Sequence, residues 1–106
     1  MAYSVEIEII SKVEILPTKE LALILESEGK PSYQHVYRAA AGVYWDNEIY
    51  GFKSTEPKDF SYPKWFQQII EVVKSEMGIQ LQLANTVSWV NVPEEVKNAI
   101  TQSSAT

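Results

Sequence analysis

The sequence predicts one small α+β domain whose elements follow the order β-α-β-β-α-β around a four-stranded antiparallel sheet. Two observations support this prediction: a long period-2 alternation near the amino terminus and a strongly amphipathic helical stretch in the second half. A strand-turn-strand pattern lies between them. This order is that of a ferredoxin-like split βαβ unit, with both long helices on one sheet face. We predict a domain spanning residues 1–101, ending in a short helix, and a flexible polar tail at residues 102–106.

The first strand is predicted over residues 4–16, where apolar and polar side chains alternate. Ile7 and Ile9 fall on one face and Glu8 on the other, which is typical of a strand with one buried and one solvent-facing side. The stretch is long for a single strand, so we expect a bulge or bend near Ser11.

Residues 18–28 are predicted to form the first helix. Thr18 is a suitable N-cap, and Gly29 is a typical helix terminator. Apolar residues within 21–25 would supply the stripe that faces the core. Because these five consecutive residues also suit a buried strand, the sequence leaves that alternative open.

A hairpin is predicted next. Residues 33–45 place aromatic and small side chains at alternate positions, which predicts a strand, and residues 48–55 predict its partner. Asp46 and Asn47 supply turn residues between the two strands. The strand also carries several alanines, which are poor strand formers, so we expect a closely packed element over them.

The second helix is the clearest element of the chain. Ser61 is its predicted N-cap, Pro63 is tolerated in the first turn, and Gly78 is predicted to end it. Phe60 and Trp65 are spaced as a hydrophobic staple. The apolar stripe of this helix comprises Tyr62, Trp65, Phe66, Ile69, Val72 and Val73.

The remaining residues predict one more strand and a short helix. Apolar and polar residues alternate from Ile79 to Trp89, with a break near Asn85. Pro93 then begins a helix in which the acidic residues that follow it complement the positive end of the helix dipole.

Composition excludes several classes of function. The 106 residues carry a net charge of −5 and contain no cysteine, which rules out disulfides, thiolate metal sites and cysteine nucleophiles. Phosphate backbones repel an acidic surface, so we expect no nucleic-acid partner. No stretch approaches the about 20 apolar residues that span a bilayer, and the first residues lack the pattern of a signal peptide. We therefore expect a cytoplasmic protein without a membrane partner.

The sequence contains few candidate catalytic residues. His35 is the only histidine and the best general base, and Asp46 or Asp59 would orient it in a Ser-His-Asp arrangement. No nucleophile motif accompanies it. Glu6 and Glu8 lie two apart on one strand face and are the best paired carboxylates. We predict no metal site and no cofactor, and no catalytic residue other than His35 if the protein is an enzyme.

The aromatic residues define a candidate binding face. Aromatic rings around a floor of alanines frame a shallow apolar pocket, and carboxylates at its rim would suit a flat cationic molecule. The alternative is that the alanines only allow close packing against the sheet. The candidate ligand-binding residues are Tyr33, His35, Tyr37, Trp45, Glu48 and Tyr50.

Residues 50–53 resemble the aromatic platform of RNA-recognition domains, but only in a glycine-aromatic pair, and the net charge disfavours that function. The first hypothesis is therefore a non-enzymatic binding protein. It would be a homodimer that binds a partner protein or a small aromatic or cationic ligand through an acidic-rimmed sheet face. One alternative is a cofactor-independent enzyme resembling the dimeric α+β barrels, with His35 as general base. Another is a small acidic inhibitor or immunity-type protein that masks a basic surface.

Overall fold

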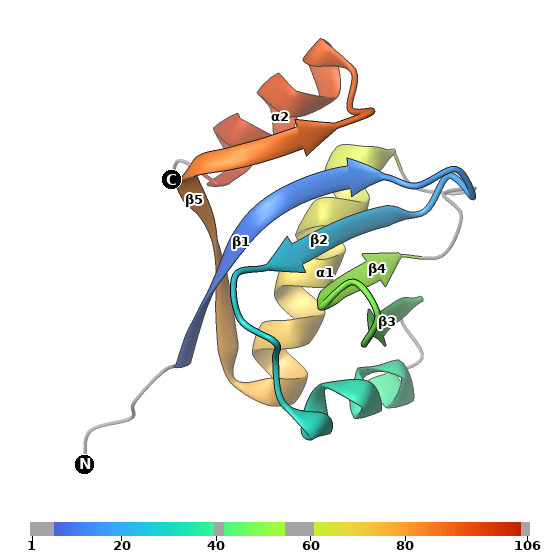
Figure 1. Cartoon of the computed structure of the whole chain (residues 1–106), viewed down its shortest axis with the longest axis vertical. Helices are drawn as coiled ribbons and strands as arrows, with labels where there is room; N and C mark the ends of the chain where they lie inside the picture. The colour runs from blue at the N-terminus through green and yellow to red at the C-terminus, as the bar shows by residue number, and fades with distance from the viewer. Residues whose placement is uncertain (1–5, 40–41, 55–60, 105–106) are drawn as a thin grey trace.

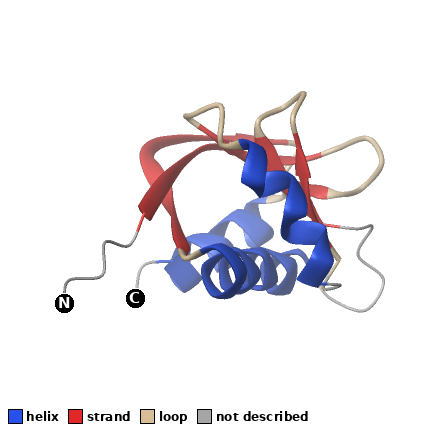
Figure 2. Ribbon diagram, turned by 90° about the horizontal axis from the view of Figure 1, so that it is seen from below, coloured by secondary structure: helices blue, strands red, loops and turns tan. Residues whose placement is uncertain are grey.

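The computed structural model describes residues 6–39, 42–54 and 61–104 and shows a small α+β domain. A five-stranded mixed sheet arches over the helices, which lie together against one of its faces (Figures 1 and 2). The strand order is β3-β4-β2-β1-β5. The elements are β1 (Glu6–Ile15), β2 (Leu21–Leu25), the 3₁₀ helix η1 (Pro31–Ala39), β3 (Val43–Asp46), β4 (Gly51–Ser54), α1 (Tyr62–Met77), β5 (Ile79–Val90) and α2 (Glu94–Ser104).

The bulge expected near Ser11 is present in β1. The pairing of β1 with β2 shifts between Ile10 and Lys12, so Ser11 is one extra residue on β1. Because of this extra residue, Ile10 and Val13 are both buried, with 0% exposed surface, although strict alternation would place them on opposite faces. Ile7 was expected on the buried face and is instead 54% exposed.

The predicted helix at residues 18–28 is wrong, and the alternative of a buried strand is confirmed. β2 (Leu21–Leu25) pairs with β1 on one side and β4 on the other. Because β2 is central, neighbouring strands pair with both of its edges, and Leu21, Ala22 and Leu23 are completely buried. Such a strand has no period-2 pattern, and its continuous apolar run imitates a short helix.

The predicted strand at residues 33–45 is also wrong for most of its length. Residues 31–39 form the 3₁₀ helix η1, whose three-residue period buries Tyr33 and Val36 and leaves the positions between them exposed. Aromatic residues at every second position imitated strand alternation. Only Val43–Asp46 is a strand, and residues 40–41 lie outside the described part of the chain.

The β3–β4 hairpin is shorter than predicted, with a four-residue turn. Asp46 pairs with Gly51, and the intervening residues 47–50 form the turn. Oδ1 of Asp46 accepts a hydrogen bond from the backbone N–H of Glu48 at 2.8 Å, which stabilises the turn locally. Tyr50 adopts a left-handed conformation with φ of 54° as the chain enters β4.

The prediction for α1 is confirmed. Ser61 precedes the helix, and the N–H of Gly78 donates to the carbonyl oxygen of Lys74 in a left-handed cap with φ of 68°. Ser61 makes no capping hydrogen bond with its side chain, and Phe60 lies outside the described residues. The buried stripe of α1 comprises Trp65, Phe66, Ile69, Val72 and Val73.

The topology differs from a split βαβ unit, because β5 runs parallel to β1 and the sheet has five strands. β2 occupies the place expected for a helix, so the order becomes β-β-η-β-β-α-β-α. The predicted four antiparallel strands are therefore wrong. β4, α1 and β5 form a crossover, since β4 and β5 run in the same direction with β2 and β1 between them.

The break expected near Asn85 is present in β5. Leu83 pairs with Ile10 of β1, but the next paired residue is Ser88, so residues 84–87 lie opposite the single residue Ser11. α2 then returns against α1 and β5 (Figure 1). It includes residues 102–104, which were assigned to the tail, while residues 105–106 lie outside the described part. The flexibility of the tail stays a prediction.

The core lies between the inner face of the sheet and α1. Phe52, Leu23 and Val13 come from three neighbouring strands, and Ile69 and Val73 of α1 pack over them. The helices leave the opposite face of the sheet uncovered by any described element (Figure 2). None of the described helices combines the length and apolar character that crossing a membrane requires.

Candidate functional site

Two of the predicted ligand-binding residues, Tyr33 and Trp45, meet in the core. Their ring centroids lie 5.2 Å apart in an edge-to-face arrangement, and both rings also contact Phe52. Tyr33 is 1% exposed. This aromatic cluster joins η1 to β3 and β4, so Tyr33 stabilises the domain and does not face an open pocket.

The predicted carboxylate pair is also held by neighbouring elements. The hydroxyl of Tyr33 donates to Oε2 of Glu8 at 2.6 Å, and Lys30 Nζ lies 2.7 Å from a carboxylate oxygen of Glu6. Burial, followed by the hydrogen bond to Glu8, raises the pKa of Tyr33 above its ordinary value. Glu6 and Glu8 thus anchor η1 and the loop before it.

His35 and Tyr37 lie on the exposed side of η1, away from Trp45. Tyr37 is 53% exposed, and His35 makes no hydrogen bond or ion pair with any residue that the structure describes. Asp59, one of its proposed orienting residues, lies outside the described residues. The comparison with dimeric α+β barrels rested on the split βαβ order, which this fold does not have. The enzyme hypothesis therefore gains no support from the geometry.

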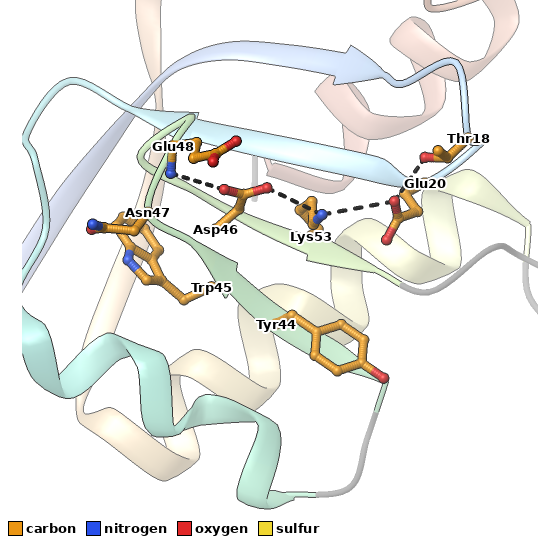
Figure 3. A pocket seen from close by; sticks show the side chains of 8 residues that line it. All are labelled: Thr18, Glu20, Tyr44, Trp45, Asp46, Asn47, Glu48 and Lys53. Atoms are coloured by element: carbon orange, nitrogen blue, oxygen red, sulfur yellow. Dashed lines mark hydrogen bonds and ion pairs between the residues drawn. The ribbon is translucent and has the colours of Figure 1, made fainter.

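Glu48 and Trp45 contribute to an open hollow at the β3 edge of the sheet (Figure 3). The hollow has a volume of about 740 Å³ and extends from the β1–β2 turn to the β3–β4 turn. We call it the acidic hollow. Its lining residues are Thr18, Glu20, Tyr44, Trp45, Asp46, Asn47, Glu48 and Lys53.

A single lysine is shared between carboxylates in the acidic hollow. Lys53 Nζ lies 3.2 Å from Oδ2 of Asp46 and 3.8 Å from Oε1 of Glu20. The Thr18 hydroxyl donates to the same Glu20 oxygen at 2.7 Å (Figure 3). With Glu48 at the rim, three carboxylates and one ammonium line the hollow, which leaves it negatively charged.

Asp46 remains ionised at neutral pH. Its partial burial raises the pKa, but the backbone N–H of Glu48, the Lys53 ammonium and the backbone N–H of Ile49 outweigh that effect. Together they hold the pKa of Asp46 below its ordinary value of 3.8. The side chain therefore presents a fixed negative charge.

Several residues of the acidic hollow were not predicted. Glu20 was placed in a helix, and only the pairing of Ala22 with Lys53 brings it beside that lysine. Tyr44 falls opposite Lys53 on the outer face, and it is 42% exposed. Tyr50 lies in the turn but does not line the hollow. If residues 21–25 are assigned to a strand and that strand is paired with β4, Glu20 falls beside Lys53.

The described part of the chain contains no cluster of residues that could bind a metal ion. No three His, Cys, Asp or Glu residues there are placed to hold an ion. Lys53 already lies between the carboxylates of Asp46 and Glu20. The arrangement suits recognition of a positively charged group better than coordination chemistry.

Comparison with known proteins places the chain in a family. The family model described as Integron Cassette Protein Hfx_Cass5 matches residues 10–87. The chain belongs to this family. The Hfx_Cass5 match begins in β1 and ends in the insertion of β5, so it contains every residue of the acidic hollow and none of α2.

A solved structure of the Hfx_Cass5 family agrees with this assignment in sequence. It is described as an integron cassette protein from the mobile metagenome of North West Arm Sewage Outfall. The two sequences are 31% identical over 93% of this chain and 96% of that chain, with a TM-score of 0.40. No curated protein matches the chain.

Proposed function

We propose that this integron cassette protein is a non-enzymatic binding protein whose acidic hollow receives a cationic side chain from a protein partner. The observation that carries the proposal is that Glu20 and Asp46 share one lysine while Glu48 adds a third carboxylate. An added guanidinium or ammonium group would offset part of this excess negative charge. The net charge of −5 on the whole chain would further attract a basic partner.

The shape of the hollow favours a side chain presented by a partner over an enclosed small molecule. Small-molecule sites usually surround most of the ligand, whereas this hollow is open along the sheet edge (Figure 3). Arginine fits its chemistry best, because a guanidinium forms paired hydrogen bonds with carboxylates and stacks on aromatic rings. Asp46 and Glu48 offer the carboxylates, and the exposed ring of Tyr44 also lines the hollow.

Titration with a tetra-arginine peptide tests this proposal. We expect the backbone amide signals of residues 44–48 to shift in NMR spectra, with a dissociation constant that rises with salt concentration. Asp46→Asn and Glu48→Gln should each weaken binding several-fold through loss of a charged partner. Glu76→Gln is the matched control, because it removes one exposed negative charge on α1 outside the hollow.

Two outcomes decide the result. Equal weakening by Glu76→Gln and Asp46→Asn would show that overall charge alone attracts the peptide, and the hollow would not be a site. If tetramethylammonium or free arginine amide binds as tightly as the peptide, the ligand is a small cation and not a partner's side chain.

The homodimer and the cytoplasmic location stay predictions. The outer face of the sheet, which no described element covers, exposes Ile7 and Tyr44 and leaves Ile24 half-buried. This face is the surface that we propose a second copy would contact. An inhibitor or immunity-type role requires the same chemistry as the main proposal, because a basic surface on the partner would bind at the acidic hollow.

A further inference from the structure

A second concavity lies on the other side of the molecule, between α1, β5 and α2. It has a volume of about 1060 Å³, larger and more enclosed than the acidic hollow. β5 forms one wall, one face of α1 forms another, and Lys97 and Thr101 of α2 border it. We call it the α1–β5–α2 groove. It shares no lining residue with the acidic hollow.

The groove follows from the irregular pairing of β5. Residues 84–87 lie opposite the single residue Ser11, so β5 leaves its regular pairing with β1 at this point. The apolar side chains around the insertion are consequently packed against the core on one side only. Ile70, Leu83, Val87 and Trp89 are all half-buried and all line the groove.

The charges in the groove are opposite to those of the hollow. Lys74 and Lys97 line it together with one carboxylate, Glu71. Among the described residues, neither lysine forms an ion pair. Lys97 Nζ lies 5.9 Å from the ring centroid of Trp89, so its ammonium stands over the apolar wall.

The two lysines are not equivalent as anion-binding groups. Lys74 lies in the last turn of α1, near the negative end of the helix dipole, and the carboxylate of Glu71 lies one turn before it. Both features oppose the binding of an anion at Lys74. Lys97 lies near the start of α2, where the helix dipole is positive, although Glu94 and Glu95 reduce that effect. Lys97 is also half-buried and adjoins Trp89, so an anion there is better shielded from water.

From this arrangement we propose that the α1–β5–α2 groove binds a small apolar molecule bearing one anionic group, such as an alkyl or aryl carboxylate. The apolar part lies along Ile70, Leu83 and Val87, and the anionic group pairs with Lys97. The site is independent of the proposed function of the acidic hollow, because the two differ in position and in the charge that they recognise. A few polar groups in an otherwise apolar concavity are typical of small-molecule sites.

Calorimetric titration with three matched amphiphiles tests the proposal. Decanoate, decanol and decyltrimethylammonium share an alkyl chain and differ in the charge of the head group. The two ions are used below their micelle concentrations and decanol below its solubility limit. We expect decanoate to bind more tightly than decanol by about tenfold, because its carboxylate gains a charged partner. NMR amide shifts should fall in residues 80–89 and around Lys97, outside the acidic hollow.

Variants assign the binding to the groove. Lys97→Met keeps the apolar stem of the side chain and should weaken decanoate binding about tenfold while leaving decanol binding unchanged. Lys74→Met should have a smaller effect. The control is Lys12→Met, on the uncovered outer face of the sheet, which removes the same charge and should leave decanoate binding unchanged. Val87→Phe should fill the groove and weaken both ligands.

Specific results would overturn the proposal. Equal affinity for decanoate and decyltrimethylammonium, or equal losses in Lys12→Met and Lys97→Met, would show that no anion site exists at Lys97. Concentration-dependent dimerisation in sedimentation experiments that Val87→Phe abolishes would show that a second copy covers the groove. Val87→Phe is checked by urea unfolding, and Lys97→Met alone decides the question if Val87→Phe does not fold.

Discussion

The acidic hollow and the α1–β5–α2 groove are both concave, but they arise from different structural causes. The hollow lies over regularly paired strands, and ion pairs and turn hydrogen bonds hold its polar side chains in place. The groove lies where pairing fails, and its lining is apolar with two unpaired lysines among the described residues. Regular strand pairing therefore holds polar side chains in place at the β3 edge of the sheet, whereas the interrupted pairing of β5 exposes apolar side chains at the opposite edge.

This comparison predicts different tolerances to truncation of side chains. Phe52→Ala, beneath the hollow, should destabilise the protein by about 3–5 kcal/mol, because Phe52 is fully buried against Tyr33 and Trp45. Ile70→Ala, on the groove wall, should cost about 1–2 kcal/mol, since water already reaches that side chain. Urea unfolding measures both free energies. Equal losses would indicate that the groove is closed in solution.

Two glycines, one in the loop before η1 and one at the end of α1, allow a sharper comparison. Gly29 and Gly78 both have left-handed φ values, of 73° and 68°. A Cβ at Gly29 would lie 2.5 Å from Cζ2 of Trp45, whereas a Cβ at Gly78 would meet no atom within 4 Å. Gly78→Ala should therefore cost about 1–2 kcal/mol from backbone strain alone. Gly29→Ala should cost about 1–3 kcal/mol more, because the Trp45 ring must move.

Thermal or urea unfolding gives the two energies, and near-ultraviolet circular dichroism reports the tryptophan environment. Only Gly29→Ala should change the dichroism, since Trp45 packs against Tyr33 there. If both variants lose the same free energy and retain the same spectrum, the packing of Trp45 against the loop before η1 is wrong.

Elements whose patterns are local could be predicted from the sequence. α1 shows its 3.6-residue period, its proline and its terminal glycine within one stretch, and the bulge at Ser11 and the interruption near Asn85 appear as breaks in alternation. β2 and η1 could not be assigned in this way. The buried pattern of β2 depends on β4, which lies some 30 residues further along the chain. In η1, Tyr33 and Tyr37 imitated a strand, because aromatic residues at every second position fit strand alternation as well as they fit a helix with a three-residue period.

The candidate site was predicted in the same uneven way. Trp45 and Glu48 were identified because aromatic and acidic residues stand beside a turn in the sequence. Glu20 and Lys53 meet only through strand pairing, so their contact requires the correct register. The groove combines α1, β5 and α2 at a point where four residues of β5 lie opposite one residue of β1, and no local pattern encodes such a junction.

The smallest expected effect concerns the pH dependence of the hollow. The pKa of Asp46 in the folded protein lies below its ordinary value of 3.8, because hydrogen bonds and Lys53 favour the carboxylate over the opposing effect of burial. The stabilisation is therefore present above about pH 4 and is lost as the pH falls through the lower, folded-state pKa. The midpoint of urea unfolding should fall between pH 4 and pH 2 less steeply in Asp46→Asn than in the natural sequence.

Because Asp46 is partly exposed, the difference should be small and should shrink in high salt. Ile70 lies in the groove away from these carboxylates, so Ile70→Ala should retain the full acid dependence of the natural sequence. Identical pH profiles for Asp46→Asn and the natural sequence would show that the Asp46–Lys53 contact adds no stability. The turn alone would then hold Asp46 in place, and Lys53 would be free to move aside for an incoming guanidinium.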